Sequence, residues 1–276
     1  MDTSFMPPAG AIAPFPHPDG EIVAASAIPG VDPDAGIDGI QFGVVGDSGN
    51  VAHAAVLLHG DGPSYYLRSV LGTPSRPTED RRRIESSLGP GVGMVFAFPR
   101  SSDRIWPGFG YDGKNGASLL AIFQYMMEKT GNRNLNCHLG GLSGASLPLN
   151  SFLALINGKR GPDAAVAAFV GNNLRTITDH DALCRPIAMQ KQGYIEAATR
   201  FTHVRFNFIH GHGGYMTYVR GHHEEVGRKV SGDASFELPY HCPDTISLLG
   251  GRLRFWSGPS HFECFKGQIH RSIFGS

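Results

Sequence analysis

Short runs of continuous apolar residues recur along the chain, and stretches with helical spacing of apolar residues separate them. A continuous apolar run is typical of a strand that is covered on both faces of a sheet. Such runs predict buried strands at 54–58, 93–98, 135–139, 164–170, 204–209 and 252–256. Two further segments, 21–25 and 39–45, predict edge strands joined through an acidic, glycine-rich turn at 31–38.

Helices are predicted between these strands. In the helix expected at 116–129, the apolar side is formed by Leu119, Leu120, Ile122, Phe123 and Met126. Three more helices are expected at 147–156, 187–200 and 219–230, and the charged segment 79–85 predicts a solvated helix face. Strands that alternate with helices in one chain predict an α/β fold, with a mostly parallel sheet and helices on both faces.

The chain shows no repeat, charge block or linker, so we expect a single domain over residues 1–276. Residues 1–20 are rich in proline, alanine and glycine and predict an extended N-terminal arm. The segment 172–190 is a candidate lid. The loop 100–114 carries aromatic residues that either line a substrate pocket or cover the core: Trp106, Phe109 and Tyr111.

The segment 136–146 has the composition of a nucleophile elbow. An extended run leads into the small residues Gly141, Ser143, Gly144 and Ala145, and an apolar helix follows. In such a turn the serine hydroxyl projects above the sheet, next to the positive end of a helix. Alanine stands at 145 where glycine is usual. The alternatives are a glycine-rich turn without catalytic function, or Ser146 as the reactive serine.

The strand predicted at 54–58 ends in His59–Gly60–Asp61–Gly62–Pro63. A His-Gly pair and small residues after a buried strand are typical of the loop that donates one oxyanion-hole amide in serine hydrolases. We expect the N–H of Asp61, with Gly62 as the alternative, to act together with the N–H of Gly144. The other interpretation is a tight turn in which His59 packs structurally.

The charge balance excludes several classes of partner. Lysine plus arginine number 24, as do aspartate plus glutamate, so the formal net charge is zero. This gives no reason to expect binding to nucleic acid or to an anionic membrane. No apolar run is long enough to span a bilayer, and the N-terminus shows no signal peptide, so we expect a cytoplasmic protein by default.

The last predicted strand is followed by small residues and then by His261–Phe262. The His-Gly loop, the Ser143 elbow and a final histidine stand in the order found in the α/β-hydrolase superfamily, which the chain resembles from its first strands to its end. The resemblance implies a sheet of about eight strands, with Ser143 as nucleophile, an acid next and His261 as general base.

The acid is where the sequence departs from that pattern. The superfamily implies a carboxylate shortly after His210–Gly211, but the next residues are His212, Gly213, Gly214, Tyr215 and Met216. We favour Asp233 as the catalytic acid. An acid after the preceding strand, as in some lipases, nominates Asp179 or Asp181. Glu224, Glu225 and Asp244 stay open, as does a site with only a Ser–His dyad.

Other histidines and the cysteines carry weaker predictions. His210 and His212 could ligate a metal, but no third ligand stands at a supporting spacing, so we expect no metal. His222–His223, next to two glutamates, predict a solvated helix face. The cysteines are far apart and form no C-x-x-C motif, so disulfides stay open: Cys137, Cys184, Cys242 and Cys264.

These features predict a serine hydrolase that cleaves carboxylic esters through an acyl-enzyme intermediate, with a small-molecule ester or acyl substrate and no cofactor. A serine at the elbow argues against epoxide and haloalkane hydrolysis, which need an aspartate there. Acyltransferase, peptidase and thioesterase activities use the same residues. The alternative from another class is a non-catalytic binding protein of the same fold, suggested by the missing acid. Oligomeric state and substrate groups are left open.

Overall fold

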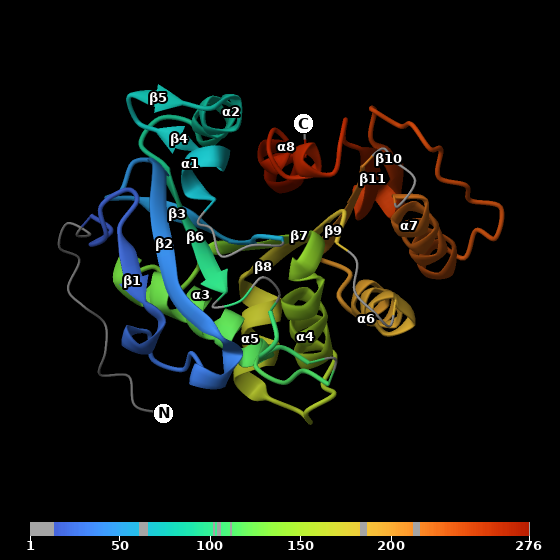
Figure 1. Ribbon diagram of the computed structural model, residues 1–276, viewed down its shortest axis with the longest axis horizontal. Helices are drawn as coiled ribbons and strands as arrows, with labels where there is room; N and C mark the ends of the chain where they lie inside the picture. Colours follow the sequence, from blue (N-terminus) through green and yellow to red (C-terminus); the bar gives the residue numbers. More distant parts are fainter. Residues whose placement is uncertain are drawn as a thin grey trace.

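The computed structural model describes residues 14–60, 66–101, 103, 106–110, 112–182, 187–211 and 216–275. Its centre is a nine-stranded sheet with strand order β1-β2-β6-β3-β7-β8-β9-β11-β10 (Figure 1). In that order the strands span Ile22–Ala24, Ile37–Gly46, Gly93–Ser101, Val51–Leu58, Asn136–Leu142, Leu174–His180, Arg205–His210, Leu253–Ser257 and Ile246–Leu248.

The strands from β6 to β11 in this order pair in parallel. β1 and β2 on one side, and β10 on the other, pair antiparallel. A separate two-stranded ribbon consists of β4 (Gly72–Thr73) and β5 (Arg76–Pro77). The prediction of a mostly parallel α/β sheet is therefore confirmed, with nine strands in the sheet where about eight were expected.

Helices cover both faces of the sheet, with α1, α2 and α8 on one side and α3, α4, α5 and α6 on the other (Figure 1). α7 packs on α6 and β9. The helices α1 to α8 span Leu67–Val70, Glu79–Leu88, Gly116–Thr130, Ser146–Ile156, Ala164–Asn172, Ile187–Arg200, Met216–Ser231 and Ile269–Phe274. Among the helices in the part of the chain described, none is long and apolar enough to cross a membrane.

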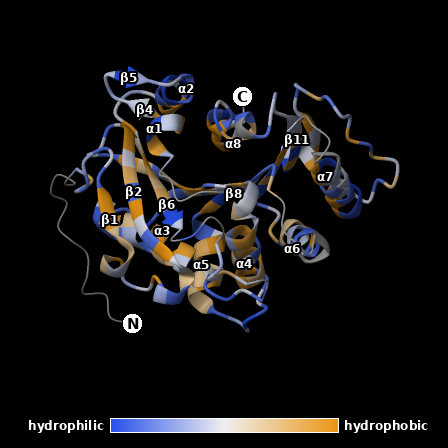
Figure 2. Ribbon diagram, viewed as in Figure 1, coloured by the Kyte–Doolittle hydropathy of each residue, from blue (hydrophilic) through white to orange (hydrophobic). Residues whose placement is uncertain are grey.

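β3 shows why continuous apolar runs form the central strands. Successive side chains of a strand point to opposite faces. Ala54, Val56 and Leu58 pack into the core under α3 and α4. Ala55 and Leu57 pack into the core under α1, α2 and α8. Both faces are covered over Ala54–Leu58, so each of these positions is apolar, and the neighbouring strands β2 and β6 are largely hydrophobic in Figure 2.

The strand predicted at 164–170 is wrong, because this segment forms helix α5. Asp163 caps the helix by accepting hydrogen bonds from the N–H groups of Ala165 and Val166. Alanine favours helix, and the buried residues Val166, Phe169 and Val170 have helical spacing while the alanines between them are exposed.

The strand expected there lies later, at β8, inside the segment 172–190 that was proposed as a lid. Its composition hides it, because Thr176, Thr178, Asp179 and His180 are polar yet buried. Hydrogen bonds satisfy the two threonines: Asn207 Nδ2 donates to Thr178 Oγ1 at 3.0 Å, and His138 Nδ1 lies 3.0 Å from Thr176 Oγ1. The segment is therefore a strand and the start of α6, with residues 183–186 outside the described part.

Two peripheral segments pack more closely than expected. Of the predicted arm, residues 14–20 are described, and Phe15 is buried against Phe42. On α2, predicted as a solvated face, Asp80 is buried and its carboxylate accepts the N–H groups of Gly267 and His270 at the start of α8. α2 thereby holds the C-terminal helix in place. Cys137, Cys242 and Cys264 are buried free thiols, and Cys184 lies outside the described residues.

Candidate active site

Ser143 occupies the sharp turn between β7 and α4. β7 ends at Leu142, a 3₁₀ turn spans Ser143–Ala145, and α4 begins at Ser146. The φ angle of Ser143 is 52°, in the left-handed region that non-glycine residues rarely adopt. A strand, a serine at positive φ and a helix together have the geometry of a nucleophile elbow.

Close contacts require small residues around Ser143. A Cβ on Gly141 would lie 2.8 Å from Leu149 Cδ1 and 3.0 Å from Ala145 Cβ. A Cβ on Gly60, just after β3, would lie 2.9 Å from Ser143 Cβ. The loop after β3 therefore lies directly against the elbow.

Ser146, the alternative serine, has a different environment. Its backbone is helical, with φ of −54°, and its side chain is buried in the first turn of α4. Ser143 is only half-buried. Ser143 is therefore the serine of this turn with both the strained backbone and the access that a reactive hydroxyl needs.

Asp181 and His261 form a hydrogen-bonded pair. Nδ1 of His261 donates to Oδ2 of Asp181 at 2.6 Å. Asp181 is fully buried, and the side chain of His261 is 23% exposed, so the carboxylate lies behind a partly accessible imidazole. Gly211 packs against both, since a Cβ there would lie 2.9 Å from His261 N and 3.0 Å from Asp181 Oδ2.

The register of the sheet brings Asp181 next to the elbow. β7 and β8 are parallel neighbours, and Leu142 pairs with His180. Ser143 and Asp181 therefore directly follow two adjacent strands, and both lie at the carboxyl edge of the sheet. His261 follows β11, which runs in the same direction and also ends at this edge.

No protein-family model and no curated protein matches the sequence. Among solved structures, acetyl xylan esterase from Aspergillus awamori aligns with 92% of this chain and 98% of its own, with a TM-score of 0.53 and 15% identity. The chain has the α/β-hydrolase fold. The enterobactin esterase of Shigella flexneri aligns with 86% of this chain and 54% of its own, with a TM-score of 0.51 and 10% identity.

Within this α/β-hydrolase fold, Asp233 does not lie at the site. It sits in an exposed turn, where its Oδ1 accepts the N–H and the hydroxyl of Ser235 at 2.9 and 2.6 Å. These hydrogen bonds lower the pKa of the Asp233 carboxyl. α7 leaves the carboxyl edge after β9 and runs back toward the amino edge, so Asp233, which follows α7, is at the wrong end of the sheet. The contact predicted for Asp233 is made by Asp181 instead.

Two of the three remaining acids considered from the sequence are engaged elsewhere, and the third is exposed. Glu224 accepts the N–H of Leu238 at 2.9 Å and pairs with Arg228, and Glu225 pairs with Lys191. Asp244 is exposed just before β10.

Asp179 is fully buried and supports the turn that carries Asp181. Its Oδ1 accepts the N–H of Ala182 at 2.7 Å. Nε2 of Gln190 donates to Oδ2 of Asp179 and to the carbonyl of Ala182, both at 3.1 Å. Burial raises the pKa of the Asp179 carboxyl to about 7. Asp181 itself has φ of 55°, so this turn holds a second residue of the site in the left-handed region.

His59 has a structural role in the described part of the loop after β3. Its Nε2 accepts the N–H of Ser101 at 3.2 Å, so the ring proton is on Nδ1, which donates to the carbonyl of Gly60 at 2.8 Å. The indole N–H of Trp106 donates to the His59 carbonyl at 3.1 Å. These bonds fix the loop as it approaches Ser143. Asp61 and Gly62, the predicted oxyanion-hole residues, lie outside the described residues.

The aromatic residues of the loop 100–114 cover the core where they are described. Trp106 and Phe109 are buried, and the indole packs on the His59 ring with centroids 4.8 Å apart. Tyr111 lies outside the described residues. Trp106 and Phe109 therefore support the loop and do not line an open pocket.

The prediction that His222 and His223 form a solvated helix face is wrong. Both are buried where α7 packs on α6 and β9, with His222 against Tyr194 and His223 against Phe208. Nε2 of His223 lies 3.4 Å from Oδ1 of Asp179. Burial lowers the pKa of each imidazole to about 3.

His210 is buried at the end of β9, where its Nε2 donates to the carbonyl of Tyr240 at 3.2 Å. Its proposed partner in a metal site, His212, lies outside the described residues. Within the described ranges, no three histidine, cysteine, aspartate or glutamate side chains are arranged to hold a metal ion.

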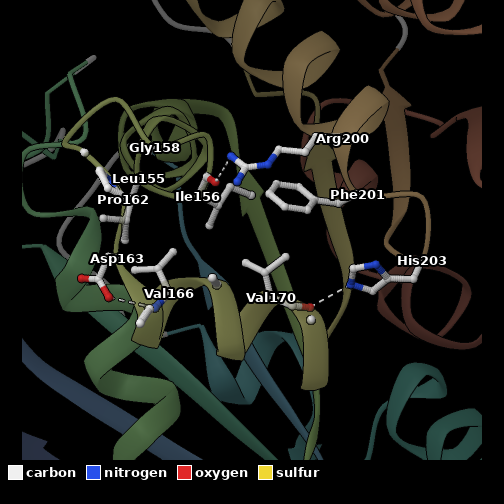
Figure 3. Close-up of a pocket in the computed structure, with 14 residues that line it drawn as sticks. Leu155, Ile156, Gly158, Pro162, Asp163, Val166, Val170, Arg200, Phe201 and His203 are labelled. Carbon is white, nitrogen blue, oxygen red and sulfur yellow. Dashed lines mark hydrogen bonds between the residues drawn. The ribbon is translucent and has the colours of Figure 1, made fainter.

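A groove of about 470 Å³ lies between α4, α5 and the end of α6 (Figure 3). Its polar rim is engaged with backbone: Arg200 Nη1 donates to the Ile156 carbonyl at 3.3 Å, and His203 Nε2 to the Val170 carbonyl at 2.8 Å. Because α5 leads into the start of β8, the groove is at the amino edge of the sheet. It lies at the opposite end of the strands from Ser143 and is separate from the candidate active site.

Proposed function

We propose that the protein is a serine hydrolase that cleaves carboxylic esters, with Ser143 as nucleophile, His261 as general base and Asp181 as the acid. The observation that supports this most strongly is the Asp181–His261 hydrogen bond, formed at the sheet edge where Ser143 has an elbow backbone. The sequence-based alternative of a non-catalytic binding protein depended on a missing acid, and the contact between Asp181 and His261 argues against that alternative.

The Asp181–His261 contact assigns the roles of the imidazole nitrogens. Because Nδ1–H donates to the carboxylate, Nε2 of the neutral ring is the basic nitrogen. In the proposed reaction it takes the proton of Ser143 as Oγ bonds to the ester carbonyl carbon. It then returns that proton to the departing alcohol as the carbon–oxygen ester bond breaks. Water then attacks the carbonyl carbon of the acyl-enzyme while Nε2 takes its proton. Nε2 returns that proton to Ser143 Oγ as the bond between Oγ and the acyl carbon breaks and the carboxylic acid is released.

The negative charge of the tetrahedral intermediate needs two aligned N–H donors. We propose the amide of Gly144, which follows Ser143 in the 3₁₀ turn at the start of α4. The second donor comes from the loop after Gly60, and Asp61 is our candidate. The hydrogen bonds of His59 support this assignment, because they hold the described part of that loop against the elbow.

Carboxylic esters of small molecules are the proposed substrates. Two solved structures with this fold, from Aspergillus awamori and Shigella flexneri, are esterases by name. Ser143 also suits ester chemistry, because an alkoxide attacks a carbonyl and a serine ester is readily hydrolysed.

Labelling with a fluorophosphonate, followed by peptide mapping, tests the proposal. We expect the label on Ser143 of the wild type and none on Ser143→Ala. Ser146→Ala is the matched control, since Ser146 is a buried helical serine three residues away, and it should label like the wild type. A folded wild type that takes no label, or takes it at another residue, would overturn the proposal.

A further inference from the structure

The proposed mechanism uses Asp181 and leaves its neighbour His180 without a role. His180 is the last residue of β8, it is fully buried, and its side chain points to the opposite side of the strand from that of Asp179. A buried histidine in this position needs a reason, because burying a polar ring is costly unless it forms hydrogen bonds.

His180 bonds to the segment that carries His261. Its Nδ1 donates to the carbonyl of Cys264 at 2.6 Å. Cys264 ends the 3₁₀ turn that follows His261, and its own N–H donates to the carbonyls of Ser260 at 3.0 Å and His261 at 3.4 Å. A bond to the Cys264 carbonyl therefore fixes the whole turn on which the imidazole of His261 is mounted.

The neighbours of His180 keep its ring in one orientation. The ring packs edge-to-face on Phe265, with centroids 5.0 Å apart. Gly140 on β7 leaves room for it, since a Cβ there would lie 3.1 Å from His180 Nε2. Among the described residues, no hydrogen-bond partner faces Nε2, so the bond from Nδ1 to Cys264 is the polar contact that accounts for the residue.

We propose that His180 is a positioning residue that sets the geometry of the Asp181–His261 pair. The last residue of β8 and the residue that follows it then contact the same turn, His180 through the carbonyl of Cys264 and Asp181 through the imidazole of His261. The contact from Asp181 holds the imidazole of His261, whereas the contact from His180 holds the backbone of the turn that carries this imidazole. The inference rests on the proposed function only for its effect on catalysis, because the arrangement of the pair can be measured without turnover.

The test compares His180→Asn with His180→Leu. The asparagine Nδ2 takes nearly the place of the histidine Nδ1 and keeps the donor, whereas leucine fills similar space without one. The proton in the short Asp181–His261 hydrogen bond should give a low-field proton NMR resonance, identified by its absence in Asp181→Asn. We expect this resonance in the wild type and in His180→Asn, and its loss in His180→Leu.

For ester hydrolysis we expect His180→Leu to lower kcat at least tenfold with KM within twofold, and His180→Asn to recover kcat to within threefold of the wild type. His203→Leu is the matched control, because His203 also bonds to a backbone carbonyl, at the far edge of the sheet. It should change stability alone. If His180→Leu does not fold, His180→Met replaces it as a more adaptable side chain without a donor.

A folded non-donor variant that keeps both the resonance and kcat would overturn the inference, as would His180→Asn impaired as severely as His180→Leu. Failure of the proposed function looks different. In that case the wild type neither labels with fluorophosphonate nor hydrolyses esters, while the resonance still depends on the donor at position 180.

Discussion

Asp181 and His261 are 80 residues apart in the sequence, and their side chains meet at 2.6 Å between Oδ2 and Nδ1. The strand that ends just before Asp181 is the direct neighbour of the strand that ends just before Ser143. The proposed acid therefore directly follows the strand adjacent to the elbow, and Gly211, just after β9, leaves room for the pair.

Replacing Asp181 by asparagine should lower kcat for ester hydrolysis by about 10³-fold or more, because the imidazole loses the carboxylate that fixes its tautomer and stabilises its charged form. Steady-state kinetics with an activated ester measures this. Asp233→Asn makes the same chemical change in an exposed turn and should leave kcat unchanged. Equal effects of the two substitutions, or a larger effect at Asp233, would rule out the assignment of Asp181.

Gly211→Ala should impair the site while the protein stays folded. Its Cβ would lie 2.9 Å from the backbone nitrogen of His261, so the turn carrying the imidazole must move. We expect kcat to fall at least tenfold in the same ester assay. Gly221→Ala is the control, since a Cβ at Gly221 in α7 meets nothing within 4 Å, and it should keep full activity and raise the free energy of unfolding by up to about 1 kcal/mol. Unchanged kcat in Gly211→Ala would argue against this packing.

Stability should fall in mild acid through buried histidines. Burial lowers the pKa of His180 to about 4, from 6.5 for a free imidazole. Between these pH values the unfolded chain binds a proton at this histidine that the folded protein does not. The contribution of neutral His180 to the free energy of unfolding is therefore fully present above pH 6.5 and is lost as the pH falls toward 4. Urea unfolding of His180→Asn and wild type at several pH values tests this. As the pH falls, the free energy of unfolding of the variant should rise relative to that of the wild type by up to about 1.4 kcal/mol per pH unit. A difference between the two proteins that stays constant with pH would contradict the lowered pKa of His180.

Asp179 should give the opposite dependence. Burial raises the pKa of its carboxyl from 3.8 to about 7, so between these values the folded protein holds a proton that the unfolded chain has lost. Its contribution to stability therefore falls as the pH rises through this window. Asp179→Asn carries no such charge, and its free energy of unfolding should rise relative to the wild type from pH 4 to pH 7. Gln190→Leu, a neutral change beside the same carboxylate, serves as the control for lost hydrogen bonds.

The elbow could be predicted from the sequence because its determinants are local. A buried strand, glycines beside a serine and an apolar helix follow one another within a few residues, and each is visible in the composition. His261 could be nominated in the same way, since it follows the last strand. These positions depend on chain order and backbone packing, which the sequence pattern carries directly.

The acid could not be singled out, because its strand does not look like one. Thr176 and Thr178 are buried and satisfied by hydrogen bonds with neighbouring strands, and Asp179 by the turn after β8 and by Gln190 of α6. Such pairing has no periodicity in the sequence. The apolar segment that precedes β8 was predicted as a strand instead, although the spacing of Val166, Phe169 and Val170 fits a helix. The preference for Asp233 had a separate origin, because the superfamily pattern places the acid after the strand that ends at His210, one strand beyond the strand that precedes Asp181.

The backbone of Ser143, with φ of 52°, has a consequence for evolution. A left-handed conformation costs an L-residue with a Cβ about 1–2 kcal/mol, and glycine avoids that cost. Ser143→Gly should therefore abolish labelling and raise the free energy of unfolding by about 1 kcal/mol, whereas Ser146→Gly, within α4, should lower it by a similar amount. Under the proposed function, selection for activity thus keeps this fold below its stability optimum at one torsion angle. A lineage released from that selection would gain stability by losing its serine.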